Sequence, residues 1–261
     1  INIIGGDGVS KKGSFLSITL LILSGELIYL LPYVLPRIFR PTFLEVFNLN
    51  NLQLGSLFSV YGIIALLSYV YGGVISDKFQ PKKLMSYSLF FTSFGGLVLA
   101  SYPSYFVLQI LYGYWGFTTV FLFWGAMIKA TRVWGGTDNQ GQAFGFLDGG
   151  RGLVAASMGS LGILIFSIFL TNDIELTSLT ERKEAFRYVI LFSSFMIFLT
   201  GLWVLFFMDS NQKDQKNNVI LDEDYGAAFG MVKGHYGADN LMLKDINHHL
   251  TNSEKTNLPV G

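Results

Sequence analysis

The chain has 261 residues, of which 51% are hydrophobic and only 14% are charged, and its formal net charge at pH 7 is zero. Soluble domains carry about a quarter charged residues, so this composition argues against a soluble protein and favours a membrane protein. A neutral chain gives no sign of a nucleic-acid-binding surface. A chain without cysteine has neither a disulfide framework nor a thiolate site.

Six long apolar runs follow one another along the chain, and each is close to the ~20 residues that a transmembrane helix needs. They are predicted at residues 14–36, 52–76, 84–102, 105–128, 141–168 and 185–208. The sequence therefore predicts an all-α membrane protein in which residues 14–208 form a bundle of six transmembrane helices.

The segments on either side of this bundle are polar. Residues 1–13 are predicted to be a cytoplasmic N-terminus, because the apolar run after Lys11 and Lys12 is too long for a signal peptide. The chain starts with Ile, so we expect its start to be processed or missing. Residues 209–261 are rich in Asn, Asp, Lys and His, and are predicted to be a cytoplasmic linker or tail that is partly disordered.

The first predicted span carries one acidic residue near its middle. Glu26 is followed by Tyr29 and Tyr33 at i+3 and i+7, so the three share one helix face. A charged residue at a helix centre costs roughly 2.5–3.5 kcal/mol on insertion and usually faces protein or a water-filled cavity. Glu26 is therefore a candidate proton carrier or substrate contact, and the alternative is an acid hydrogen-bonded to a neighbouring helix. Pro32 and Pro36 are expected to kink or end this helix.

The second predicted span ends in a stripe of small residues. Ser68, Gly72 and Ser76 repeat at four-residue spacing, which lets another helix approach closely. The connection to the third span, residues 72–83, reads Gly-Gly-Val-Ile-Ser-Asp-Lys-Phe-Gln-Pro-Lys-Lys.

That connection resembles the loop between helices 2 and 3 of the major facilitator superfamily, G-x-x-x-D-[RK]-x-G-x-[RK]-[RK]. The matching positions are Gly73, Asp77, Lys78, Lys82 and Lys83. Gln80 departs from the pattern, because the family usually has glycine there. The resemblance covers residues 14–208 and implies that they form the N-terminal half of a twelve-helix transporter, in which the charges of this loop latch the cytoplasmic side shut.

The fifth predicted span contains two charges of opposite sign. Asp148 and Arg151 are three residues apart, so they can pair along one helix face. They are either a self-neutralised pair or part of a cytoplasmic gate. The family often places an acid at the inner end of helix 4, but this chain has Lys129 and Arg132 there. Asp148 is therefore a candidate for the missing acid of the gate.

Two further patterns bear on the branch of the family. Residues 140–152 resemble the helix 4–5 junction of bacterial members that move small organic solutes. Drug/proton antiporters of the family usually carry a Gly-Pro pair in helix 5, whereas residues 159–162 read Gly-Ser-Leu-Gly without a proline. The sequence thus favours an organic-solute transporter over a drug antiporter.

The distribution of Lys and Arg predicts the orientation of the bundle. These residues are more numerous in the loops on the side of the N-terminus than in the opposite loops, which include Arg37 and Arg40. Positively charged loops are retained in the cytoplasm. We therefore expect a multi-pass protein of the cytoplasmic (inner) membrane with both termini inside.

The function predicted from these features is secondary active transport of a small organic solute, with proton coupling through Glu26 and alternating access between two halves. Residues 257–260, Asn-Leu-Pro-Val, resemble the segment that leads into helix 7, so the second half is expected to follow in the same chain. A six-helix protein that pairs with another copy or a separate half is the alternative. Two other readings stay open: a non-transporting sensor or receptor on this fold, and an inactive half-transporter fragment.

The sequence offers no chemistry for an enzyme or a cofactor. It has no phosphate-binding loop, nucleophile motif or paired catalytic carboxylates. His235, His248 and His249 lie in the tail and lack the further ligands that a metal site needs. The expected partners are a small-molecule solute, the lipid bilayer and a second six-helix half, with no cofactor, metal or nucleic acid.

Overall fold

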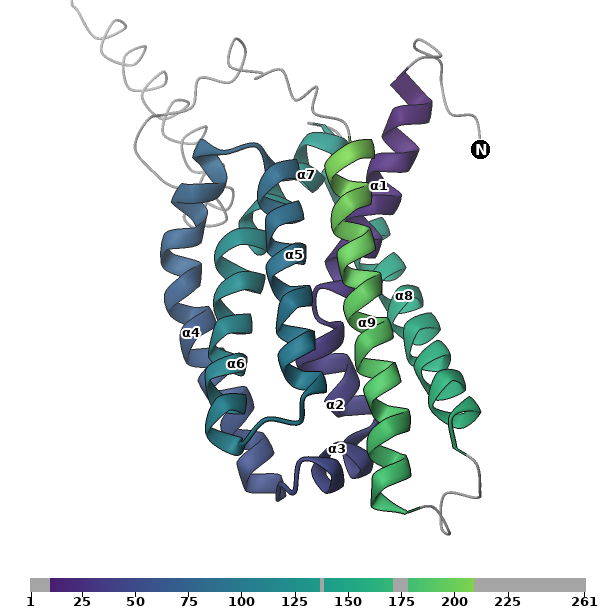
Figure 1. Cartoon of the computed structure of the whole chain (residues 1–261). Helices are drawn as coiled ribbons and strands as arrows, with labels where there is room; N and C mark the ends of the chain where they lie inside the picture. The colour runs from purple at the N-terminus through teal and green to yellow at the C-terminus, as the bar shows by residue number, and fades with distance from the viewer. Residues whose placement is uncertain (1–9, 137–138, 171–177, 209–261) are drawn as a thin grey trace, which may run out of the picture. The chain divides into compact units, whose positions relative to one another are not determined.

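A computed structural model of the chain describes residues 10–136, 139–170 and 178–208, with side chains from residue 15 onward. Within these ranges every regular element is helical (Figure 1). Residues 1–9 of the predicted N-terminus and the whole predicted tail, including its three histidines, lie outside the described residues.

Five helical runs in the described part of the chain are long and apolar enough to cross a membrane, and a sixth span is made of two helices joined at a bend. The five runs are α4 (Asn51–Lys78), α5 (Pro81–Ala100), the continuous stretch Tyr105–Gly135, α8 (Gln140–Ile168) and α9 (Leu179–Phe207). The six predicted spans are therefore confirmed, with helix ends that differ from the predicted ones by up to seven residues.

The first span is broken at its middle. It consists of α1 (Ser10–Leu27), the π-helical turn η1 (Leu30–Val34) and α2 (Leu35–Ile38), with a bend of 41°. Pro32 has no N–H to donate, and the N–H of Val34 reaches back five residues to the carbonyl of Tyr29 at 3.2 Å. The predicted proline kink is thus confirmed. Residues 37–51, which join the first two predicted spans, are not a plain loop, because they contain α3 (Arg40–Val46).

The fourth span also contains a π-helical segment. It runs through α6 (Tyr105–Phe117), η2 (Thr118–Trp124) and α7 (Gly125–Gly135). The predicted end at residue 128 is too early, because α7 continues past Lys129 to Gly135.

Small residues let α4 pack closely against this fourth span. A Cβ atom built on Gly72 would lie 3.0 Å from the carbonyl oxygen of Phe121, and one on Gly116 would lie 2.6 Å from that of Tyr61. Ser68 and Ser76 are also buried, and a Cβ atom built on Gly125 of the fourth span would lie 2.7 Å from Oγ of Ser76. The predicted small-residue stripe is therefore a helix-packing surface. It holds α4 against the fourth span, which carries Trp124.

The helices differ strongly in how much of their surface the bundle covers. The most apolar window of α5 is 61% buried, whereas those of α4 and α8 are only 17% buried. Large apolar side chains such as Leu66, Val70, Leu153 and Leu164 are exposed on these two helices, which lie at opposite edges of the bundle in Figure 1. Such surfaces suit lipid or another protein.

Candidate functional site

A cavity of about 470 Å³ opens among the first, second, fourth and fifth spans. Its volume lies within the usual range for small-molecule sites. Its charged and aromatic lining residues are Glu26, Tyr29, Tyr33, Arg37, Arg40, Phe58, Trp124 and Arg151. The three residues predicted for substrate or proton coupling are therefore together on one cavity.

An ion pair between two spans lies on this cavity. Arg151 of α8 donates from Nε to the Oε2 of Glu26 on α1 at 3.3 Å. Both side chains are largely covered, with exposed fractions of 21% for Arg151 and 15% for Glu26. Each charge is thus neutralised inside the bundle by a partner from another helix.

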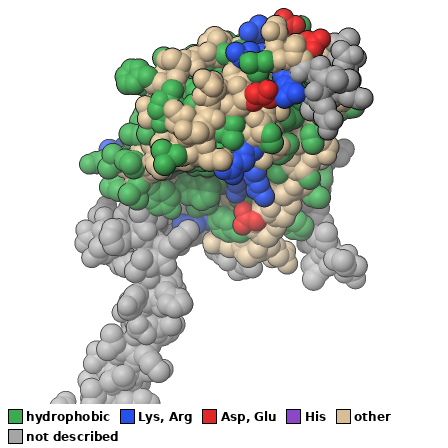
Figure 2. Space-filling view, turned by 90° about the horizontal axis from the view of Figure 1, so that it is seen from below, with side chains coloured by type: hydrophobic (Ala, Val, Ile, Leu, Met, Phe, Trp, Pro, Cys, Tyr) green, Lys and Arg blue, Asp and Glu red, His purple; other side chains and the backbone are tan. Residues whose placement is uncertain are grey.

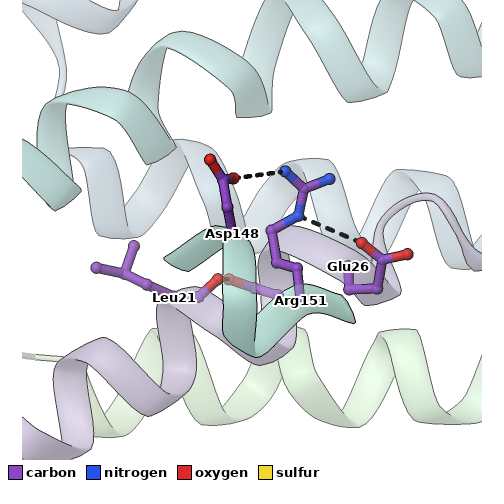
Figure 3. A network of polar contacts seen from close by, with 5 residues as sticks. Leu21, Glu26, Asp148 and Arg151 are labelled. Carbon is purple, nitrogen blue, oxygen red and sulfur yellow. Dashed lines mark hydrogen bonds and ion pairs between the residues drawn. The ribbon is translucent and has the colours of Figure 1, made fainter. Parts of the chain in front are cut away.

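The same guanidinium also reaches a second carboxylate. Nη1 of Arg151 lies 3.6 Å from Oδ1 of Asp148, which confirms the predicted pairing at i,i+3. Figure 3 shows Arg151 with Asp148 on one side and Glu26 on the other. Asp148 is 72% exposed. Arg151 therefore links a largely buried carboxylate, that of Glu26, to an exposed one, that of Asp148.

Close helix packing brings Arg151 into reach of α1. A Cβ atom on Gly25 would lie 3.2 Å from Cδ of Arg151 and 3.0 Å from the sulfur of Met127. On the facing helix, a Cβ atom on Gly150 would lie 2.7 Å from two carbons of Ile22. Glycine at both positions therefore leaves the space in which the arginine stem lies along α1.

Aromatic rings form the wall beside the ion pair. The guanidinium carbon of Arg151 lies 5.7 Å from the ring centre of Tyr29, a distance at which a cation is attracted to the ring face. Tyr33 stacks on Phe58 with ring centres 5.3 Å apart. Tyr33 and Trp124 both come from the π-helical segments, which occur frequently at functional sites.

Two arginines that the sequence assigned to an outer loop also line the cavity. Arg37 lies on α2 and Arg40 on α3. Arg40 donates from Nη2 to the side-chain oxygen of Asn51 at 2.9 Å, whereas Arg37 has no hydrogen bond or ion pair with any described residue. Figure 2 looks onto the end of the bundle with α2 and α3, where Lys and Arg side chains gather near the middle of the face with Asp and Glu side chains beside them.

The residues of the superfamily-like motif lie at the other end of the bundle, and most of them are helical. Gly73, Asp77 and Lys78 belong to α4, and Lys82 and Lys83 to the first turn of α5, so only Phe79 and Gln80 form the connection. The predicted loop of residues 72–83 is therefore much shorter than expected.

This end of the bundle is held by a contact that the sequence did not predict. Among the described residues, neither Asp77 nor any motif lysine takes part in an ion pair. Instead, the ammonium of Lys129 donates to the backbone carbonyls of Ser76 and Asp77, each at 3.1 Å. Asp148 pairs with Arg151 and not with the motif lysines.

Sequence reasoning placed Glu26 and Arg151 in two separate sites, whereas the structure joins them in one. The available signal was that Glu26 and Arg151 are charges of opposite sign inside different spans, where a charge usually pairs with another. No comparable pattern in the sequence indicated that Arg37, Arg40 and Trp124 would line the cavity. The described residues contain no cluster of three or more His, Asp or Glu side chains that could hold a metal ion.

The sequence is similar to those of known proteins over most of the chain. Residues 16–236 match the sequence model of the Major Facilitator Superfamily. The chain is 29% identical over 205 residues to Inner membrane protein YqcE of Escherichia coli (strain K12), covering 78% of this chain and 46% of that protein. It is 27% identical over 218 residues to Inner membrane protein YihN of the same organism, with 84% and 48% coverage. The chain thus spans about half the length of these curated relatives. No solved structure matches it significantly.

Proposed function

The chain belongs to the major facilitator superfamily, a family of membrane transporters, and from this premise we propose that it forms one half of a secondary active transporter for a small organic solute. The observation that carries this proposal is the covered ion pair between Glu26 and Arg151 on the wall of a cavity of about 470 Å³. Ionisable residues inside transmembrane segments are rare and mark substrate or ion pathways.

Glu26 is the proposed proton carrier. A proton on its carboxylate would remove the negative partner of Arg151, and the guanidinium would then keep only Asp148, at 3.6 Å. Because a neutral and a charged Glu26 hold Arg151 differently, the proton changes the contacts between α1 and α8. That difference is what allows a proton to bias one conformation over another.

Transport further requires a second six-helix half facing the cavity, since access alternates between two halves. The exposed face of α8 supports this partner: Cβ atoms added at Gly141, Gly145, Gly149 or Gly152 would meet no atom within 4 Å. Small residues at such spacing let another helix approach closely. We place both termini and the motif end of the bundle in the cytoplasm, following the charge bias of the loops.

The test is solute uptake by the native protein that carries this chain, reconstituted in liposomes with an imposed pH gradient. Glu26→Gln keeps the size and hydrogen-bonding capacity of the side chain but cannot carry a proton. We expect it to abolish the acceleration of uptake by the gradient while solute exchange without a gradient continues.

Glu184→Gln is the matched control, because Glu184 is exposed on α9 and lies off the cavity. It should respond to the gradient as the unmodified protein does. Gradient-driven uptake that survives Glu26→Gln would remove the proton role, and a protein that moves no solute in any condition would favour a sensor on this fold.

A further inference from the structure

We propose that the cavity takes a small organic anion, whose carboxylate or phosphate group binds between Arg37 and Arg40 while its body lies against the aromatic wall. This inference rests on the proposed transport function and names the substrate class of the same site. The guanidinium of arginine matches both anionic groups with two parallel hydrogen bonds.

The charges of the lining carry the argument. The cavity is lined by three arginines and a single acid, and that acid, Glu26, is already paired with Arg151. Asp148 also contacts Arg151, and Glu45, the acid on α3, pairs with Arg182 of α9 at 2.6 Å. Glu26 is close enough to Arg37 to interact with it electrostatically, but among the described residues no acid forms an ion pair with Arg37 or Arg40. With three arginines and one acid in its lining, the cavity keeps an excess of positive charge.

The position of these two arginines argues against a purely interfacial role. They lie at the end of the bundle that the charge bias assigns to the outside, where Lys and Arg are disfavoured. Arg40 is held by the side chain of Asn51, which fixes its direction without neutralising it. Both arginine side chains are exposed where they line the open cavity, so an anion from outside the chain can reach them.

The remaining lining sets the size and character of the ligand body. Tyr33 and Phe58 offer a stacked pair of rings, and Trp124 lies on the same cavity. Flat aromatic walls suit a sugar ring or a short carbon chain, and about 470 Å³ limits the ligand to a small molecule.

Trp124 supplies a built-in reporter for the test. Ligand binding is measured as the part of the tryptophan fluorescence change that Trp124→Phe removes, on the protein in lipid nanodiscs. Two pairs of probes are titrated, and each pair sets an anion against a neutral relative: succinate against succinamide, and ribose 5-phosphate against ribose. We expect saturable binding of at least one anion and none of its neutral counterpart.

Substitution of single arginines distinguishes the effect of the cavity arginines on anion binding from the effect of the protein's overall charge. Arg37→Gln and Arg40→Gln should each weaken anion binding about tenfold or more, because a hydrogen bond to a charged group is lost. Arg132→Gln on α7 removes the same charge off the cavity and should leave the Kd unchanged.

Three results would overturn the inference: no saturable response to either anion, equal binding of the neutral probes, or unchanged anion binding in Arg37→Gln and Arg40→Gln together. Uptake assays distinguish this failure from a failure of the transport proposal. Uptake of a neutral solute that does not depend on Arg37 would leave a transporter with a different substrate. Anion binding without uptake would confirm the ligand class and contradict transport.

Discussion

Arg151 is the residue on which the candidate site depends, because its guanidinium contacts two carboxylates that differ in environment. Glu26 is 15% exposed and lies at 3.3 Å, whereas Asp148 is 72% exposed and lies at 3.6 Å. If the guanidinium is removed, water can solvate the exposed carboxylate of Asp148 fully but the largely buried carboxylate of Glu26 only in part. Loss of the guanidinium should therefore matter chiefly through Glu26.

A double-mutant cycle measures this dependence. Arg151→Gln should destabilise the bundle by about 1–3 kcal/mol, because it leaves a largely covered carboxylate without its cation. Adding Glu26→Gln should restore part of that loss, since the second change removes the uncompensated charge. Thermal unfolding in detergent of the single and double variants provides the comparison. A double variant less stable than Arg151→Gln alone would contradict the ion-pair account.

For single residues, the sequence identified the charged side chains inside the spans but not all of their ion-pair partners. Glu26, Asp148 and Arg151 were found because an ionisable residue inside a span is costly. Only the pair within one helix could be predicted, because helical spacing fixes which residues are neighbours. The contact between Glu26 and Arg151 depends on how α1 and α8 lie against each other, and Arg37 needed the fold to bring α2 to the cavity.

Among the elements, the contact between α4 and α6 offers the sharpest test of packing. Gly116 faces the backbone of α4, where a Cβ atom would lie 2.6 Å from the carbonyl oxygen of Tyr61. A Cβ atom on Gly113 of the same helix would lie 3.5 Å from a side-chain carbon of Val60, which is ordinary contact.

Gly116→Ala should lower the stability of the bundle by about 1–3 kcal/mol, because a backbone neighbour cannot yield as a side chain can. Gly113→Ala is the matched control and should be neutral or slightly stabilising, since alanine favours the helix. The measurement is the melting temperature of each purified variant, which should be lower for Gly116→Ala than for Gly113→Ala. Equal melting temperatures would mean that α4 and α6 separate more easily than this packing implies.

The long helices were predictable, whereas their interruptions were predictable only in part. Length and apolar composition suffice for six spans, and Pro32 indicated the bend of the first span. The π-helical segment Thr118–Trp124 contains no proline or other breaker, so nothing local marks it. The short helices α2 and α3 lie in a stretch that reads as a loop, because elements of 4 and 7 residues are too brief for a periodic pattern.

For the whole molecule, the predicted orientation can be tested directly because the chain has no cysteine. In intact cells, a maleimide that does not cross membranes should label Ser104→Cys, at the turn before α6, and spare Lys83→Cys at the start of α5. Both residues are exposed in the bundle. Permeabilised cells should label both variants, and the reverse pattern in intact cells would invert the orientation.

Assembly with a second half is testable on the open face of α8. Gly145→Leu places a large side chain where the bundle has no neighbouring atom within 4 Å. The bundle's own stability should change by no more than roughly 0.5 kcal/mol, whereas uptake should be lost because the approaching helix is blocked.

Gly159→Leu on the same helix is the contrasting variant, because a Cβ atom there would lie 2.5 Å from Ile38. It should destabilise the bundle itself, as shown by a lowered melting temperature. Normal uptake by Gly145→Leu would mean that no helix packs on this face of α8.

The hydrogen bonds of Lys129 differ from the ion pair of Glu26 in one respect that concerns acidification. Their acceptors are the backbone carbonyls of Ser76 and Asp77, and an amide oxygen does not take up a proton at any pH a cell experiences. Replacing either side chain leaves both acceptors in place. Neither mild acid nor substitution of those two residues therefore removes the acceptors at this end of the bundle, whereas the ion pair of Arg151 with Glu26 depends on a carboxylate that substitution of Glu26 removes.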